Sequence, residues 1–372
     1  MIARGGRIVP DDILNAMTYK FSFTAEMVRD LQIIERARAE VGLTVLPPVV
    51  VEDLRLQARV RSTHFSTRIE GNRLTLEEAG QVALEGRNFP GRERDTLEVK
   101  HYFQALAQIE KWVDENKPVT EERICQLHAL IYGGKRKGTP YRDGQNVIRD
   151  SGGGIVYLPP EAKDVPGLMK ELSHWIEQSE KTQPIPVVAG IAHYQFVTIH
   201  PYYDGNGRTA RALATWLLYR GGYDLGKFYA LEEFYARDLD GYYNALQLHP
   251  DHNYYEGRAF AEMTSWLGYF IKGMAAVFES VTREVRERSL TPNENSDQAL
   301  RKLDRRARIV LGLFSKQETI TANDVAHALG LSPRQARELL TEWTEAGWLE
   351  IGDAARKSRR YHLSAEYRRF IG

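Results

Sequence analysis

Apolar residues recur at helical spacing through most of residues 24–287, and only short connections separate the periodic segments. Some segments open with a recognisable start signal, such as the capping box Thr75-Leu76-Glu77-Glu78. Two short runs rich in β-branched residues, one ending at Arg149 and one that starts at Ile155 and is ended by Pro159-Pro160, flank a glycine-rich turn and predict a hairpin. The pattern therefore predicts a mostly α-helical bundle that carries one β-hairpin.

A second pattern begins after a polar, proline-containing stretch at residues 288–298, which predicts a linker. Beyond it, Ser332 has the pattern of a capping box, with Pro333 at the first helical position. The elements expected in this part are helices around residues 300–315, 322–329 and 336–346, followed by strands at 348–351 and 360–363. This order predicts a small α+β domain at residues 299–372.

The run His200-Pro201-Tyr202-Tyr203-Asp204-Gly205-Asn206-Gly207-Arg208-Thr209-Ala210-Arg211 holds the most informative chemistry. A breaker-free helical pattern follows, so the glycine-containing loop opens a helix whose free N–H groups can bind an anion. Arg208 and Arg211 share one face of that helix. Asp204 can ligate a hard cation such as Mg²⁺, and the ordinary pKa of His200 suits proton transfer near neutral pH. The run predicts a polyphosphate site with a proton acceptor beside it.

This run resembles the signature of the Fic family, His-Pro-Phe-x-(Asp/Glu)-Gly-Asn-Gly-Arg-x-x-Arg, and departs from it only at Tyr202. The resemblance implies a Fic-type helical bundle with a β-hairpin flap. It also implies a protein adenylyltransferase, a nucleotidyltransferase that uses ATP and Mg²⁺ to place AMP on a target protein. His200 would be the general base for a Ser, Thr or Tyr hydroxyl of that target, which could be the chain itself. Asp204 would hold the Mg²⁺ between the α- and β-phosphates.

The resemblance assigns the remaining residues of the run to the phosphates. Backbone N–H groups of Gly205, Asn206 and Gly207 would cradle them, since glycine allows close backbone approach. Arg208 would neutralise the β-phosphate and Arg211 the γ-phosphate. Gly207 also favours transfer of AMP over transfer of a terminal phosphate, because family members that transfer a terminal phosphate carry lysine at this place.

A second motif lies far upstream, in a helix expected at about residues 51–70 and stopped by Gly71-Asn72. Glu70 lies on its last turn, where a carboxylate is poorly matched to the helix dipole and suggests a partner cation. Ser66-x-x-x-Glu70-Gly71 resembles the inhibitory helix motif of the Fic family. In that motif the glutamate pairs with the second arginine, here Arg211, and blocks productive ATP binding. Two alternatives to this inhibitory role stay open. Glu70 is an ordinary solvated glutamate, or it orients a water that removes AMP from a modified target.

Two further segments extend the resemblance. The hairpin, best matched at Tyr141-Arg142 and Pro159-Pro160, resembles the flap that pairs with an extended segment of the target. Tyr242 and Leu246, four residues apart, resemble the family's adenine-side segment, although such a pair is also typical of a core. His193 lies in an apolar stretch and is expected to be a buried structural histidine.

The C-terminal elements resemble a winged helix-turn-helix domain, in which the helix after Ser332 enters the major groove and the wing contacts the DNA backbone. The candidates are Arg334, Gln335 and Arg337 for base edges, and Arg356, Lys357, Arg359 and Arg360 for phosphates. Residues 299–372 hold fourteen Lys or Arg and nine Asp or Glu, a net charge of +5 in a chain that is neutral as a whole. Winged helices also dock proteins or form dimers, so both roles stay open.

The 372 residues suffice for two or three domains. We expect a helical region at residues 1–110 that contains the inhibitory helix, a catalytic core at 111–287, the linker, and the C-terminal domain. The single cysteine, Cys125, excludes a disulfide framework, and no apolar run is long enough to span a bilayer. We therefore expect a cytoplasmic protein without a membrane partner, and a homodimer is compatible with the sequence.

Two classes of function follow. The first is an AMP transferase that Glu70 restrains, with removal of AMP from a protein as the alternative reaction. The second is a DNA-binding regulator whose Fic-like part senses a nucleotide. An intact motif, with His200, Asp204 and both arginines present, favours the first.

Overall fold

The computed structural model describes residues 19–134, 137–149, 152–290, 305–315, 317–329, 331–353 and 359–368. Contacts between Cα atoms divide the chain into two compact units. One comprises Met1–Gly42 and Leu56–Thr282, and the other Leu43–Arg55 and Arg283–Gly372. The predicted linker at residues 288–298 begins inside a helix that continues to Leu290, and the rest of it lies outside the described residues.

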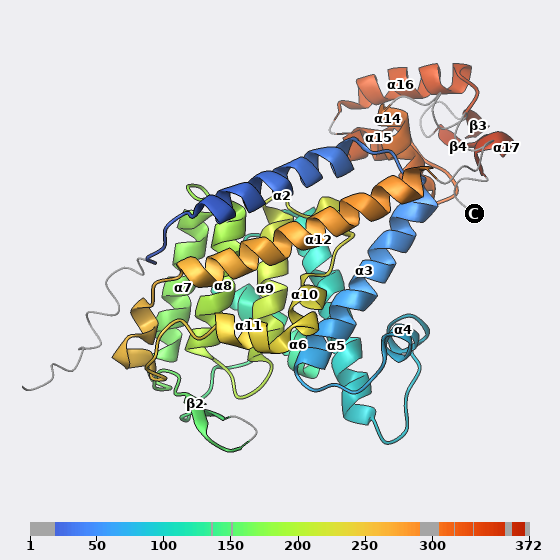
Figure 1. Ribbon diagram of the computed structural model, residues 1–372. Helices are drawn as coiled ribbons and strands as arrows, with labels where there is room; N and C mark the ends of the chain where they lie inside the picture. The colour runs from blue at the N-terminus through green and yellow to red at the C-terminus, as the bar shows by residue number, and fades with distance from the viewer. Residues whose placement is uncertain are drawn as a thin grey trace, which may run out of the picture. The chain divides into compact units, whose positions relative to one another are not determined.

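The first unit is built mainly from helices, as the hydrophobic pattern predicts (Figure 1). The helices are α2 (Ala25–Leu43), α3 (Pro48–Ile69), α4 (Leu76–Glu85), α5 (Glu93–Asp114), α6 (Glu121–Gly133), α7 (Val165–Ser179), α8 (Ile185–Ile199), α9 (Asn206–Arg220), α10 (Leu231–Arg237), α11 (Leu239–Ala245) and α12 (Thr264–Leu290). The division assigns the start of α3, up to Arg55, and the end of α12, from Arg283, to the second unit. Short 3₁₀ turns occupy Leu225–Lys227, Tyr254–Glu256 and Arg258–Phe260. The capping box at Thr75 is present, and it begins α4.

Helices α8 and α9 form the centre of this unit, and they run next to each other in Figure 1. All residues of α8 except two are buried, which fits its nearly uninterrupted apolar sequence. Gly190 lets α12 come close, because a Cβ there would lie 2.9 Å from the Leu267 side chain. The indole N–H of Trp266 donates to the Gly190 carbonyl at 2.7 Å. The loop between α8 and α9 is thus fixed at both ends by a rigid core.

The predicted hairpin is present. Strands β1 (Ile148–Arg149) and β2 (Ile155–Tyr157) pair antiparallel, with Ile148 opposite Tyr157. Tyr157 is buried, and its hydroxyl donates to the Thr198 carbonyl at 2.6 Å, which fastens the hairpin to the end of α8. The turn residues 150 and 151 lie outside the described residues.

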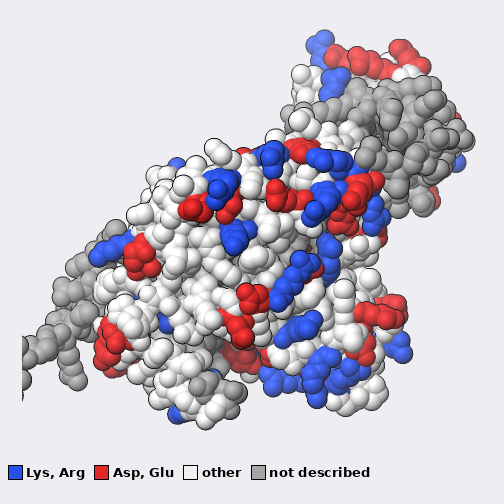
Figure 2. Space-filling model, in the orientation of Figure 1, with Lys and Arg blue, Asp and Glu red and all other residues white. Residues whose placement is uncertain are grey.

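Charged side chains of both signs are spread over the face of the molecule in Figure 2, and Lys and Arg gather where α3 ends near α5. None of the described helices combines the length and the apolar character needed to cross a bilayer.

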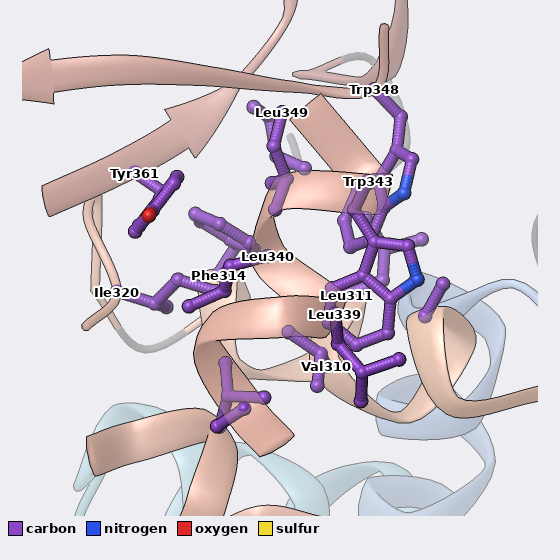
Figure 3. Packing of buried hydrophobic residues seen from close by; sticks show 14 of the residues in the cluster. Val310, Leu311, Phe314, Ile320, Leu339, Leu340, Trp343, Trp348, Leu349 and Tyr361 are labelled. Atoms are coloured by element: carbon purple, nitrogen blue, oxygen red, sulfur yellow. The ribbon is translucent and has the colours of Figure 1, made fainter. Parts of the chain in front are cut away.

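The described part of residues 299–372 has the predicted order of elements. They are α14 (Arg305–Leu311), a 3₁₀ turn (Gly312–Ser315), α15 (Ala322–Leu329), α16 (Pro333–Glu345), the antiparallel strands β3 (Leu349–Asp353) and β4 (Arg360–Leu363), and α17 (Ala365–Arg368). Ser332 caps α16 through the predicted capping box. Side chains from these elements enclose a separate core that includes Phe314, Leu340, Trp343 and Trp348 (Figure 3). The assignment of this unit to the winged-helix class stays a prediction.

Candidate active site

His200 directly follows α8 and caps it in a left-handed conformation, with φ 51° and ψ 59°. Its imidazole Nδ1 lies 3.3 Å from the Val197 carbonyl. A carbonyl only accepts hydrogen bonds, so Nδ1 carries the proton and Nε2 keeps a free lone pair. Burial lowers the pKa of His200 to about 4. The ring is therefore neutral at pH 7 and can accept a proton.

Two side chains shape the loop that follows His200. Asn206 accepts a hydrogen bond from the Tyr202 N–H at 3.0 Å and donates one to the Tyr202 carbonyl at 2.7 Å. His128 of α6 stacks on the Tyr202 ring, with centroids 3.5 Å apart, and its Nε2 lies 2.8 Å from the Asp204 carbonyl. The amide of Asn206 is thus committed to the loop, and its backbone is the part left for a ligand.

Asp204 and Arg208 meet where this loop enters α9. Asp204 Oδ1 accepts from the Gly205 N–H at 2.6 Å and from Arg208 Nη2 at 3.2 Å. The Asp204 side chain is 44% exposed, whereas that of Arg208 is 2% exposed. The Nε of Arg208 is buried without a hydrogen-bond partner among the described residues. The described residues thus leave this donor for the acceptor atom of a ligand.

The carboxylate of Asp204 fits a cation that arrives with a nucleotide. Proteins typically hold Mg²⁺ through one or two carboxylates, and waters and substrate phosphates supply the other ligands. Among the described residues no group of three or more His, Cys, Asp or Glu could hold a metal by itself. Asp204 is half exposed and lies next to the helix N-terminus, so it can supply one such ligand.

Glu70 and Ser66 of the predicted inhibitory motif meet Arg211 in the structure. Arg211 Nη2 lies 2.8 Å from Glu70 Oε1 and 2.9 Å from the Ser66 carbonyl, and its Nε donates to Ser66 Oγ at 3.0 Å. The Arg211 side chain is 1% exposed and that of Glu70 is 29% exposed. Glu70 thus lies just past the C-terminal end of α3 and has a cation as its partner. The sequence suggests such a partner, because a carboxylate at the negative end of a helix dipole is unfavourable by itself.

Gly207 makes this approach possible. A Cβ at this position would lie 2.2 Å from Glu70 Oε1 and 3.1 Å from Arg211 Nη1. A side chain at position 207 would therefore occupy the place of the Glu70 carboxylate. The glycine serves the contact with Glu70 as well as the close backbone approach that a phosphate requires.

Arg142 ties the hairpin to His200, and the sequence motif did not assign it this role. Its side chain is buried, and its Nε donates to the His200 carbonyl at 2.9 Å. The guanidinium also donates to the carbonyls of Gly144 and Pro160, at the two ends of the flap. One side chain therefore holds both ends of the flap against the backbone of the candidate base.

The adenine-side assignment of Tyr242 and Leu246 stays a prediction. Tyr242 and Leu246 are 1% and 6% exposed, so both belong to the core, and Tyr242 OH lies 2.9 Å from His193 Nε2. His193 is buried, as predicted, and burial lowers its pKa to about 3. The exposed ring is that of Tyr243, whose hydroxyl lies 3.4 Å from the Ile69 carbonyl. Helical spacing alone could not distinguish the ring that faces inward from its neighbour.

The candidates for DNA contact lie in the other unit. Arg334, Gln335 and Arg337 are exposed at the start of α16, as are Arg359 and Arg360 near β4. Gln335 is committed to the capping box, where its Oε1 accepts from the Ser332 N–H at 3.1 Å, and Arg334 Nε lies 3.2 Å from Glu338. Arg356 and Lys357 lie outside the described residues.

Residues 118–218, which include α6, the flap, α8 and α9, match the model of the Fic/DOC family. This part of the chain is similar to a Fic domain. The "Protein adenylyltransferase Fic" of Drosophila mojavensis is 33% identical over 172 residues, which are 45% of this chain and 33% of that protein. The protein of the same name from Drosophila melanogaster is 30% identical over 171 residues, 45% of this chain and 34% of that protein. The chain thus spans about a third of the length of these curated relatives.

Solved structures share the fold of this chain. A Fic family protein from Desulfovibrio desulfuricans superimposes with a TM-score of 0.58 at 24% identity, covering 94% of this chain and 98% of that chain. A Fic domain containing signaling protein from Bacteroides thetaiotaomicron has a TM-score of 0.58 at 20% identity, covering 69% of this chain and 96% of that chain. At these identities the likeness concerns the fold alone.

Proposed function

We propose that this chain transfers AMP from ATP to a Ser, Thr or Tyr hydroxyl of a protein. The observation that carries the proposal is a neutral His200, with a free Nε2, on the loop that leads into α9, whose first turns carry the buried Arg208 and Arg211. Relatives that bear the name protein adenylyltransferase support the same reaction.

The proposed reaction needs little from the protein except position and charge. The target hydroxyl oxygen attacks the α-phosphorus, and its proton moves to Nε2 of His200. The bond from the α-phosphorus to the bridging oxygen breaks, and pyrophosphate leaves. Arg208 and Arg211 stabilise the charge that develops on the β- and γ-phosphates, and Mg²⁺ on Asp204 would supply further positive charge.

We further propose that Glu70 restrains this reaction. Its carboxylate occupies the Arg211 donor that a γ-phosphate would use, so ATP must displace it or bind without that contact. The pair is strong because the guanidinium is almost fully buried, and such a cation requires a counterion.

Mass spectrometry tests the transfer directly. The chain is incubated with ATP and Mg²⁺ as wild type, as Glu70→Gly and as the double variant Glu70→Gly, His200→Ala. We expect a mass gain of one AMP in the Glu70→Gly variant, and none once His200 is also replaced. A gain that persists without His200 would contradict its role as the base.

The reverse reaction is tested on the same material. Modified Glu70→Gly protein is purified from nucleotide and mixed with unmodified wild type. Stable AMP over the time of the assay is the result expected for a transferase. A loss of AMP that depends on wild-type Glu70 would instead favour a hydrolase in which Glu70 orients the attacking water.

For the second unit we propose protein docking rather than DNA contact. Helix α16 exposes Glu338, Glu342 and Glu345 beside its two arginines, and Figure 2 shows acidic side chains along it. A groove-binding helix meets phosphates, and its affinity depends on neutralising them. Filter binding across a salt series is therefore expected to show negligible retention of bulk DNA even at low salt. Retention that falls steeply with salt would favour DNA contact.

A further inference from the structure

A cleft of about 330 Å³ lies beside the turn that follows α3. Glu70 lines one side of it, and Glu93, Arg94 and Glu98 line the side formed by the first turns of α5. The cleft therefore brings a second carboxylate, Glu98, to the same region as the inhibitory one. Nothing in the motif at residues 200–211 predicts a role for α5.

Glu98 is the second counterion of Arg208. Its Oε1 lies 3.5 Å from Arg208 Nη1, on the other side of the guanidinium from Asp204. The Glu98 side chain is 14% exposed and that of Arg208 is 2% exposed. Glu98 thus pairs with Arg208 in the same way as Glu70 pairs with Arg211. Both arginines of the candidate phosphate site are therefore paired with carboxylates.

Other contacts hold Glu98 in this place. Its Oε1 accepts from Arg94 Nε at 3.0 Å, and its Oε2 accepts from Asn72 Nδ2 at 3.1 Å. Asn72 is itself buried, and its Nδ2 also donates to the Asp95 carbonyl at 2.9 Å. Glu98 therefore keeps two strong partners when Arg208 turns away, so its release from Arg208 leaves no buried carboxylate without a partner.

We propose that Glu98 competes with the β-phosphate of a bound nucleotide for Arg208. This inference rests on the proposed function, which assigns Arg208 to the β-phosphate. A buried guanidinium needs anions as partners, and while no nucleotide is bound Glu98 occupies Nη1 of Arg208 while Asp204 occupies Nη2. When a nucleotide binds, its β-phosphate replaces Glu98 at Nη1, and the free Nε of Arg208 supplies a further donor. Glu98 thereby weakens binding of nucleotides that carry a β-phosphate.

The test is calorimetric titration of the full chain with ATP, ADP and AMP in the presence of Mg²⁺. The variant Glu98→Gln keeps the size of the side chain, removes its charge and replaces one acceptor oxygen with an NH₂ donor. We expect it to bind ADP and ATP at least about fivefold more tightly than wild type, the lower end of typical coupling between two sites. AMP affinity should stay at its wild-type value, because AMP has no β-phosphate.

Glu93→Gln is the matched control. Glu93 lines the same cleft and lies on the same helix, but its carboxylate accepts from the Gly91 N–H rather than from an arginine of α9. Its replacement removes the same charge and should leave all three affinities unchanged. Glu98→Asp is a second variant, which withdraws the carboxylate from Arg208 while keeping its charge. It should also raise the affinity for ADP, and it provides a second test if the glutamine variant folds poorly.

Equal affinities of wild type and both Glu98 variants for ADP would overturn the inference. A parallel change for AMP, or an equal effect of Glu93→Gln, would also overturn it, because either would show a general effect of charge. If wild-type chain and Glu70→Gly both fail to bind ATP, the proposed function fails and the inference falls with it. Binding of ATP by wild type without an effect of Glu98 would refute the inference alone.

Discussion

At the scale of residues, Gly207 and Glu70 depend on each other. The missing side chain of Gly207 leaves the space in which Oε1 of Glu70 reaches Arg211, and a Cβ there would lie 2.2 Å from that oxygen. The atom in the way is the end of a flexible side chain, so the backbone can remain in place. Glycine at this position therefore decides whether the inhibitory contact can form.

A double-mutant cycle measures this dependence. In the wild-type background, Glu70→Gln leaves a buried guanidinium with a weaker partner and should cost about 1–3 kcal/mol of unfolding free energy. In a Gly207→Ala background the pair is already separated, so the same change should cost less than half as much. Urea unfolding of the four proteins gives both values. Equal costs in the two backgrounds would contradict the predicted contact.

The pH dependence of transfer reports on His200. Because burial lowers its pKa to about 4, the imidazole is already deprotonated throughout the range in which an exposed histidine titrates. The kcat/KM of the Glu70→Gly variant should therefore stay level as pH falls from about 8 to about 5.5, and decline only nearer the lowered value. An inflection near the ordinary histidine pKa would show that His200 is not held in the buried environment described here.

At the scale of elements, helix ends position the chemistry. His200 ends α8 in a left-handed conformation, and Gly205 precedes α9, so the two central helices deliver the base and the N–H groups to one loop. The end of α3 delivers Glu70 to the same place. The order of apolar and breaking residues predicts the start of α9 and the end of α3, because caps are local in sequence.

The capping box of α16 gives an element-scale prediction. The Ser332 hydroxyl accepts from the Gln335 backbone N–H, and Gln335 Oε1 accepts from the Ser332 backbone N–H. Ser332→Ala should lower the stability of this unit by about 1 kcal/mol, whereas Ser332→Thr should change it much less. Thermal unfolding of the three proteins is the measurement. Equal midpoints for all three would mean that the cap contributes nothing.

At the scale of the whole molecule, the sequence predicts the individual elements better than the contacts between residues far apart in the chain. The helical bundle, the hairpin and the loop at residues 200–211 follow from local patterns. Glu70 could be assigned to Arg211 only through a family resemblance, since 141 positions separate them. Glu98 and Arg142 carry no local signal, because their roles come from contacts with Arg208 and the His200 carbonyl across the fold.

The contact between Glu70 and Arg211 is the central claim, and incorporation of labelled AMP from ATP tests it most directly. Wild type, Glu70→Gly and the control Glu77→Gly, whose glutamate lies in the first turn of α4, are compared under the same conditions. We predict that Glu70→Gly raises auto- and target-modification at least about tenfold, the factor that about 1.4 kcal/mol of released inhibition gives, while Glu77→Gly does not. Equal incorporation by wild type and Glu70→Gly would contradict the account.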